Sequence, residues 1–529
     1  MHHQTISRRQ ATFGILGGLM PWRARAAASE ARPNFLVVLS DDVGWGDFQC
    51  YNPQGRIPTP NLNRMAREGM RFTDAHTPAA LCAPTRYSII TGNYPWRGRM
   101  PNGTWGYNQA PQFLPGQKTV AHVLQSSGYR TAMFGKVHYG GVFETDGAGK
   151  ADFSKPMRVG HREWGFDYSY VLLGGHQAPP YFYMENNRMV GDPRKVEQLP
   201  VGPRGKGHVG QAGPGLPDWD NTKVGETLTT KAIAFVDDHL ARNRKEGRTR
   251  PFFIHFCSDG AHSPYNPPEE LLGTGVKGSS GMTAHTDMVH EVDVIVGKLT
   301  EALAKRGLLS NTLIIATSDN GGLPFEREHG HDAVGGLRGY KSFIFEGGHR
   351  VPFLARWGDG TPGGSKIPPG AVRNQVIGIH DIVPTFAELA GAELGADQAL
   401  DSVSLAPVLL ARRGDDQPVR TTLLVQSSPG RDAFSEARSE PRSPASQPAN
   451  AQVRADMPSH NMAHALREGQ WKLTIDVQDE PAALYDLGND LAEKRNLLRD
   501  PSQAERVKRM TRLYREIRQS KRSTPPLRG

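Results

Sequence analysis

Two polar pairs in the sequence have the composition of a metal site. They are Asp41 with Asp42, directly after residues 34–39, and Asp319 with Asn320, just after residues 312–317. Several carboxylate and amide oxygens together suit hard divalent cations such as Ca²⁺ and Mg²⁺. An isolated Asp-Asp pair more often caps a helix or lines a turn. The residue types alone therefore make these four residues candidate metal ligands.

A third candidate is Cys82, in the segment Leu-Cys-Ala-Pro-Thr-Arg-Tyr-Ser-Ile-Ile-Thr-Gly at residues 81–92. A lone cysteine is usually a small buried hydrophobe. Pro84 favours a helix that starts here, because proline is tolerated in the first turn of a helix. Residue 82 would then face the positive end of that helix, where anions bind.

The elements that must position these residues alternate along the chain. Short apolar runs predict buried strands at residues 34–39, 129–134, 251–257 and 312–317. Helical patterns lie at residues 59–68, 119–127, 227–240 and 285–306. This alternation predicts an α/β fold with a mostly parallel sheet between helices. Both polar pairs then lie at the carboxyl ends of strands, where proteins with such folds bind their ligands.

The last part of the chain predicts a different architecture. Residues 426–461 form a Ser-, Pro- and Arg-rich loop, after a main domain over residues 33–425. Strand patterns at 464–477 and 483–486 precede a charged helix at 501–519, which predicts a small antiparallel sheet plus helix over residues 462–529. Two further stretches, 140–156 and 199–221, are read as surface loops.

The N-terminal residues 1–28 predict an export signal. Ser-Arg-Arg-Gln-Ala-Thr-Phe at residues 7–13 precedes a short apolar run and the alanine-rich residues 24–28, as in twin-arginine signals. The run is too short for a membrane span, which needs roughly 20 residues. We therefore expect a periplasmic or secreted protein, exported by the twin-arginine machinery, with no membrane span after cleavage.

Charge and cysteine content limit which partners and how many disulfides the protein can have. The signal holds four arginines and no acid, so its removal lowers the formal net charge from +9 to +5 in a chain of 529 residues. Basic residues are interspersed with acids, which argues against a nucleic-acid partner and permits anionic substrates. Besides Cys82 there are only Cys50 and Cys257, which are either two free thiols or one disulfide.

The motifs together resemble those of the sulfatases. Residues 81–92 resemble the segment in which sulfatases convert a cysteine to formylglycine, and residues 128–138 resemble the second sulfatase signature. The remaining matches are the metal motifs at 41–47 and 317–322, a His-x-Pro element at 262–264 and a lysine motif at 337–352. The chain is thus similar to formylglycine-dependent sulfatases of the alkaline phosphatase-like superfamily, in particular to arylsulfatases and N-acetylgalactosamine-6-sulfatase-like enzymes.

The resemblance implies a role for each matched residue. The metal ligands would be Asp41, Asp42, Asp319, Asn320 and residue 82, holding Ca²⁺ or Mg²⁺. Cys82, converted to formylglycine by a maturation enzyme, would attack sulfur as a hydrated aldehyde and form a covalent sulfo-enzyme. Asp319 would accept a proton, and His138 would take the proton of the second hydroxyl as sulfate leaves.

The other matched residues would serve the sulfate and the leaving group. Arg86 would steady the aldehyde and the metal carboxylates, Lys136 and Lys341 would contact sulfate, and His262 would bind sulfate or protonate the leaving oxygen. In the second signature this chain has Val137 and Tyr139 where Trp and Leu are common. His329, His331 and Asp332 precede the lysine motif and either touch substrate or face water.

Three functions remain open at this point. The first is hydrolysis of sulfate monoesters of aryl alcohols or carbohydrates, with a sulfated small molecule or glycan as substrate. The second is hydrolysis of phosphonate monoesters or phosphodiesters, because enzymes of the same superfamily share the aldehyde and the metal. The third is anion binding without catalysis, if Cys82 stays a thiol.

Overall fold

The computed structural model describes residues 1, 32–100, 103–204, 207–428 and 462–525. The predicted export signal and nearly all of the loop at 426–461 lie outside these residues. Residues 32–529 group into one compact unit. Among the described helices, none is both long and apolar enough to cross a membrane.

The unit is built on a ten-stranded sheet. From edge to edge its strands are β16 (Ala371–Gly378), β2 (Met70–His76), β15 (Arg350–Trp357), β14 (Thr312–Ser318), β1 (Asn34–Ser40), β11 (Phe252–Cys257), β3 (Arg130–Lys136), β4 (Tyr168–Leu172), β5 (Met184–Glu185) and β6 (Arg188–Met189). The four strands predicted from apolar runs, β1, β3, β11 and β14, are neighbours and run parallel. The predicted mostly parallel α/β fold is confirmed.

Helices cover both faces of the sheet because the central strands are buried on both sides. On β1, Phe35, Val37 and Leu39 belong to one core, and Leu36 and Val38 belong to another. The first core includes side chains of α2 (Cys82–Thr91), α3 (Val120–Ser126) and α7 (Ile382–Ala390). The second includes those of α1 (Pro60–Glu68), α4 (Val224–Glu246) and α5 (Ala284–Lys305). Helix α4 is longer at both ends than the helix predicted at residues 227–240.

One half of the sheet departs from the parallel pattern. Strand β15 pairs antiparallel with both β14 and β2. It contains Pro352, which cannot donate a ladder hydrogen bond, and the register shifts between Val351 and Phe353. A proline inside a sheet is tolerated at such a bulge. The carbonyl of Pro352 accepts a hydrogen bond from the Thr317 hydroxyl at 2.8 Å, which ties the bulge to β14.

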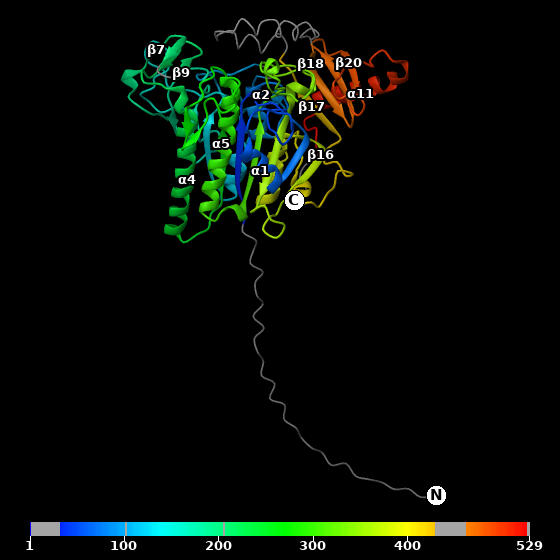
Figure 1. The fold of residues 1–529 in the computed structure, drawn as a ribbon, viewed down its shortest axis with the longest axis horizontal. Helices are drawn as coiled ribbons and strands as arrows, with labels where there is room; N and C mark the ends of the chain where they lie inside the picture. Colours follow the sequence, from blue (N-terminus) through cyan, green and yellow to red (C-terminus); the bar gives the residue numbers. More distant parts are fainter. Residues whose placement is uncertain (2–31, 101–102, 205–206, 429–461, 526–529) are drawn as a thin grey trace. The chain divides into compact units, whose positions relative to one another are not determined.

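The C-terminal residues form the predicted small antiparallel sheet. Its strands are β17 (Thr422–Gln426), β18 (Met462–Glu468), β19 (Trp471–Asp476) and β20 (Pro481–Asp486), and α11 (Ala504–Gln519) packs against it through Met510 and Tyr514. In Figure 1 this sheet and α11 lie beside the end of the main sheet that carries β16. Because β17 ends at Gln426, where the Ser-, Pro- and Arg-rich loop was predicted to begin, the small sheet takes its first strand from the chain before that loop.

The stretch at 199–221 was predicted to be a loop, and the structure corrects this. It contains three short strands, β8 (Gly202–Arg204), β9 (Gly207–Val209) and β10 (Gly213–Gly215), and β10 pairs with β7 (Glu197–Leu199). Strands of three residues give too short a pattern to be recognised in the sequence. In Figure 1 β7 and β9 lie at the end of the molecule opposite α11.

Candidate active site

The sheet brings the two polar pairs together. Strands β1 and β14 pair in parallel with Ser40 opposite Ser318, so both pairs leave the same edge. The backbone N–H of Asp42 donates to Asp319 Oδ1 at 3.4 Å, and Asn320 Nδ2 donates to Asp42 Oδ1 at 2.9 Å. The four residues of the two pairs are all buried, as is Cys82, the fifth predicted ligand. Parallel pairing thus explains why residues so far apart in sequence share one site.

Two residues of the site have left-handed backbones. Asp42 has a φ of 61° and His138 a φ of 60°. Residues other than glycine rarely adopt this backbone conformation, which costs about 1–3 kcal/mol for each of them. Outliers of this kind cluster at functional sites, where the surrounding structure holds them in place. They turn the chain sharply just after β1 and just after β3.

Cys82 is the first residue of α2, as Pro84 predicted. Its Sγ, with one carboxylate oxygen each of Asp41 and Asp319, forms a group whose atoms lie within 4.8 Å of one another. His138 Nδ1 lies 3.5 Å from Sγ on the other side. Burial raises the pKa of the Cys82 thiol to about 11. As a thiol, residue 82 is therefore a poor nucleophile at neutral pH.

Arg86 and Lys136 hold the carboxylates in place. Arg86 donates through Nε to Asp319 Oδ2 at 2.9 Å, and its Nη2 lies 3.6 Å from Asp41 Oδ2. Lys136 Nζ donates to the same Asp41 oxygen at 2.5 Å. Arg86 also donates to the carbonyl of Lys136 at 3.3 Å. The arginine predicted to steady the metal carboxylates does contact them, one helical turn beyond Cys82.

Lys341 and His262 approach Asp42 from two other segments. Lys341 Nζ lies 2.9 Å from the Asp42 carboxylate, and His262 Nε2 lies 3.8 Å from it. The Nδ1 of His262 lies 2.7 Å from the carbonyl of Ser263, so this nitrogen carries a hydrogen and Nε2 is the ring nitrogen that faces Asp42. The structure therefore gathers every residue of the predicted site around Cys82.

The charges at the site favour a cation. Burial works to raise the pKa of Asp41, but the charges of Lys136, His262 and Arg86 outweigh it and lower this pKa well below its usual value. Burial and the neighbouring Asp41 raise the pKa of Asp319 to about 7. Asp41 Oδ1 and Asn320 Oδ1 are buried and have no hydrogen-bond partner among the residues that the structure describes. Unpaired buried oxygens beside crowded carboxylates are what a hard divalent cation requires.

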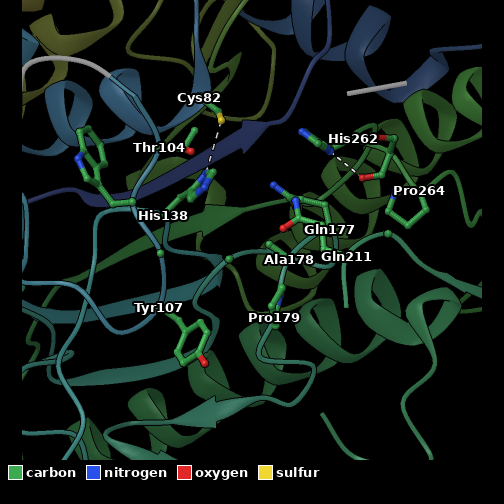
Figure 2. A pocket seen from close by; sticks show the side chains of 15 residues that line it. Cys82, Thr104, Tyr107, His138, Gln177, Ala178, Pro179, Gln211, His262 and Pro264 are labelled. Carbon is green, nitrogen blue, oxygen red and sulfur yellow. Dashed lines mark hydrogen bonds between the residues drawn. The ribbon is translucent and has the colours of Figure 1, made fainter. Parts of the chain in front are cut away.

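A cavity of about 490 Å³ opens onto this cluster. Cys82, His138 and His262 line its inner end, and Tyr107 and Pro179 lie at the end away from Cys82 in Figure 2. The nucleophile position therefore opens into a space large enough for a small organic ester. Burial, with the charges of Lys136 and Arg86, lowers the pKa of His138 well below its usual value. Its neutral ring can accept a proton at neutral pH.

The structure corrects one expectation about the loop before Lys341. His331 neither faces water nor points at the cavity: it is buried, and its Nε2 lies 2.8 Å from Asp47 Oδ1. Its Nδ1 accepts a hydrogen bond from the Arg56 N–H at 3.2 Å. Asp47 also accepts from the Gly44 N–H at 2.6 Å, so His331 braces the loop that begins with Asp41.

Other residues of the site were missed in the sequence. His176 donates through its ring Nε2 to the His262 carbonyl at 2.9 Å. Its backbone N–H donates to Asp259 Oδ1 at 3.2 Å. Both His176 and Asp259 are buried. No periodic pattern marks them, because His176 lies in an irregular segment after β4. Cys50 and Cys257, whose pairing was open, are free thiols.

Comparison with known proteins identifies the family. A sequence model of the sulfatases matches residues 33–392. The chain belongs to the sulfatase family. Sulfatases hydrolyse sulfate esters, so the chain is a sulfuric ester hydrolase.

Its relatives span most of its length. An N-acetylgalactosamine-6-O-sulfatase of Bacteroides thetaiotaomicron is 28% identical over 92% of this chain and 92% of its own. Human arylsulfatase A is 32% identical over 88% of this chain and 83% of its own. A solved structure of a B. thetaiotaomicron sulfatase, from work on the metabolism of multiple glycosaminoglycans, superposes with a TM-score of 0.73 at 25% identity. It covers 92% of this chain and 100% of that one. This sulfatase thus shares both sequence and fold with enzymes of the family.

Proposed function

We propose that this sulfatase cleaves sulfate monoesters of carbohydrates or aryl alcohols with a formylglycine at position 82 and a divalent cation. The observation that carries the proposal is the position of Cys82, between the carboxylates of Asp41 and Asp319 and the imidazole of His138. Because burial raises its thiol pKa to about 11, residue 82 serves better as an oxygen nucleophile. The Sγ marks where that oxygen would stand.

The residues fit a cation that binds through oxygen. Asp41, Asp42, Asp319 and Asn320 would hold it, and the unpartnered Asp41 Oδ1 and Asn320 Oδ1 are free to do so. We expect Ca²⁺, with Mg²⁺ as the alternative, because both prefer carboxylate and amide oxygens. Once bound, the cation would polarise sulfate and lower the pKa of the nucleophile.

The remaining side chains move protons and balance charge. Lys136 and Lys341 are buried ammonium groups beside the carboxylates, and they would offset the negative charge of a bound sulfate. His262 would protonate the leaving oxygen from its place at the cavity wall. The neutral His138 would take a proton from residue 82 as sulfate departs. Arg86 would keep Asp319 in position.

The names of the relatives indicate two substrate classes, aryl sulfates and 6-sulfated N-acetylgalactosamine. We infer that the substrate is a sulfated small molecule or glycan of one of these classes. Phosphonate monoesters and phosphodiesters are the competing substrates, since related active sites cleave both kinds of ester. Matched sulfate and phosphate esters of one alcohol separate the two functions, and faster cleavage of the phosphate diester would reject ours.

The decisive test combines mass and activity. Co-expression with a formylglycine-generating enzyme should make the peptide that contains residue 82 lighter by roughly 18 Da, the change from thiol to aldehyde that the nucleophile requires. Cys82→Ala should abolish turnover of 4-nitrophenyl sulfate. The matched control is Cys50→Ala, which removes another free thiol outside the cavity and should retain activity. An unconverted peptide in a fully active enzyme would refute the proposal.

We further propose that residues 1–28 direct export of the protein by the twin-arginine route, to the periplasm or beyond it. The support is the Arg8-Arg9 pair before a short apolar run. Replacing both arginines by lysine should leave the precursor in the cytoplasm. Fractionation with N-terminal sequencing measures this, and unchanged export of the variant would refute the proposal.

A further inference from the structure

Between its inner end at Cys82 and its outer end at Tyr107, the cavity contains polar groups that sulfate chemistry does not use. Gln177 follows β4 and Gln211 lies between β9 and β10, so two separate segments each contribute a carboxamide to the lining. Figure 2 shows these two side chains next to each other near His262, with Tyr107 farther from Cys82. This part of the cavity would surround the leaving group of an ester whose sulfate lies at Cys82.

The carboxamide of Gln177 is buried and has no hydrogen-bond partner among the described residues. Gln177 is only 6% exposed, and its Oε1 is buried without a hydrogen bond. In the described part of the chain, its Nε2 has no hydrogen-bond partner either. A buried carboxamide without partners costs free energy that a ligand can recover. It offers two donors and an acceptor, the combination that pairs with hydroxyl groups.

The structure holds Gln177 close to the sulfate end of the cavity. Gly175 has a φ of 73°, and a Cβ there would lie 2.3 Å from Gln177 Oε1, 2.5 Å from Asp259 Oδ1 and 3.0 Å from Lys136 Cδ. The glycine therefore makes the space in which Gln177 packs beside Lys136. A carboxamide in this position can reach substituents adjacent to the sulfated carbon of a substrate.

Gln211 combines a fixed backbone with a free side chain. Its N–H donates to the Tyr181 hydroxyl at 3.1 Å, and its carbonyl accepts from the same hydroxyl at 2.7 Å. The side chain is exposed at the cavity and makes no hydrogen bond within the described residues. Gln211 can thus adjust to a ligand without movement of its loop.

Tyr107 adds an aromatic surface at the outer end. Its half-buried ring packs 6.3 Å, centroid to centroid, from Phe143 and from Phe153. An aromatic face supported in this way suits the apolar face of a sugar ring. Two carboxamides and one aromatic ring together match a pyranose better than they match a plain aryl group.

We propose that Gln177 and Gln211 are specificity-determining residues that hydrogen-bond hydroxyl or amide groups beside the ester of a pyranose sulfate, whose ring lies against Tyr107. The inference rests on the proposed sulfatase function of the same cavity. Sites built to bind a substrate hydroxyl discriminate strongly against an analogue that lacks it. The carboxamides therefore favour sugar sulfates over aryl sulfates.

The test compares two esters in matched variants. Gln177→Leu and Gln211→Leu keep side-chain size and remove the polar atoms. For N-acetylgalactosamine 6-sulfate, each should lower kcat/KM about 10-fold or more, whereas for 4-nitrophenyl sulfate kcat/KM should stay within about threefold. The control is Gln198→Leu, on exposed β7 and outside the cavity lining, which should change neither value. Equal losses on both esters, or no loss on the sugar ester, would overturn the proposal.

A binding measurement separates this inference from the proposed function. In the Cys82→Ala background, Gln177→Leu should weaken the Kd for N-acetylgalactosamine 6-sulfate about 10-fold and leave the Kd for inorganic sulfate unchanged. Equal weakening for both ligands would mean that Gln177 contacts sulfate, against the proposal. If the parent enzyme cleaves no sulfate ester yet the binding difference appears, the proposed function fails and the specificity role stands.

Discussion

The cluster beside Cys82 and a second cluster between the two sheets each gather three buried side chains that can bind a metal ion. In the second, ligand atoms of His76, Glu346 and His349 lie within 4.8 Å of one another, as do those of Asp41, Cys82 and Asp319 in the first. By ligand geometry alone, both would be metal sites. We call the second the junction cluster, because Lys472 of β19 completes it.

The two clusters differ in what already occupies them. Lys472 Nζ lies 3.0 Å from Glu346 Oε1, 3.1 Å from His349 Nε2 and 2.8 Å from Glu493 Oε1. An ammonium group therefore sits where a metal ion would bind. At the cluster beside Cys82, which we call the catalytic cluster after its proposed role, Asp41 Oδ1 and Asn320 Oδ1 have no hydrogen-bond partner within the described residues. Side-chain cations stand at both clusters, since Lys136 Nζ lies 2.5 Å from Asp41 Oδ2. What distinguishes the catalytic cluster is that Asp41 Oδ1 and Asn320 Oδ1 stay open, among the residues described, for a metal ion.

The largest expected effect is at the catalytic cluster. Asp41→Asn should lower kcat/KM at least about 1,000-fold, because it removes a carboxylate from the cation and a partner from Lys136. Chelation of the wild-type enzyme should abolish activity, and Ca²⁺ should restore it. As the control, Glu346→Gln should leave the response to chelator unchanged. Full activity in the presence of a strong chelator would contradict the distinction between the clusters.

The next largest effect is expected at the junction cluster. Lys472→Met should lower the free energy of unfolding by about 3–5 kcal/mol, because it leaves Glu346 and Glu493 buried without their ammonium partner. Urea unfolding measures this. The matched control is Lys508→Met on α11, whose exposed pair with Glu505 should contribute less than about 1 kcal/mol. Similar losses in the two variants would show that burial of the cluster does not matter.

The two histidines of the junction cluster should make the protein less stable in acid, while Glu493, whose pKa burial raises to about 7, contributes in the opposite direction. Burial lowers the pKa of His76, and burial with the charge of Lys472 lowers that of His349 well below its usual value. The unfolded chain binds these protons near pH 6.5, so stability is full above that value and falls as pH drops below it, by up to about 1.4 kcal/mol per pH unit for each histidine. Melting temperatures from pH 7.5 to 5 should show a decline that is smaller in His349→Gln. An equal decline in that variant would contradict the assignment.

The smallest effect is a gain of metal binding. Lys472→Ala removes the ammonium group and leaves His76, Glu346 and His349 grouped as they are. We expect Zn²⁺ to bind this variant and to stabilise it by about 1 kcal/mol at a concentration roughly fivefold above its Kd. Melting temperatures with and without Zn²⁺ report this, with the wild type as the control. Absence of any shift in the variant would show that the grouping alone is insufficient.

The two clusters also show what the sequence could predict. The catalytic residues lie at strand ends and in motifs, so the apolar runs before Asp41 and Asp319 already place them at one edge of the sheet. The left-handed backbones of Asp42 and His138 could not be predicted, because tertiary contacts impose them against the preference of the residues.

For the junction cluster, Glu346 and His349 do lie in the lysine motif at 337–352, but no pattern indicates that they meet His76 and Lys472. His76, Glu346 and Lys472 come from distant elements, and their approach depends on how the small sheet packs. The antiparallel strand β15 was also missed, since Pro352 interrupts its pattern. Likewise Gln177 and Gln211 belong to irregular segments, where composition says little about which side chains face a cavity. Long-range packing, rather than local propensity, determines where the junction cluster, strand β15 and the two glutamines lie.

The depth at which residue 82 lies has a consequence for the order of events in the cell. Only 2% of Cys82 is exposed, at the start of a helix that is buried along its whole length. An enzyme that must grasp the surrounding peptide cannot do so once α2 has packed. On the proposed mechanism, conversion of Cys82 therefore belongs to the nascent, still unpacked chain, and a copy that folds before this step would stay inactive however well it is assembled.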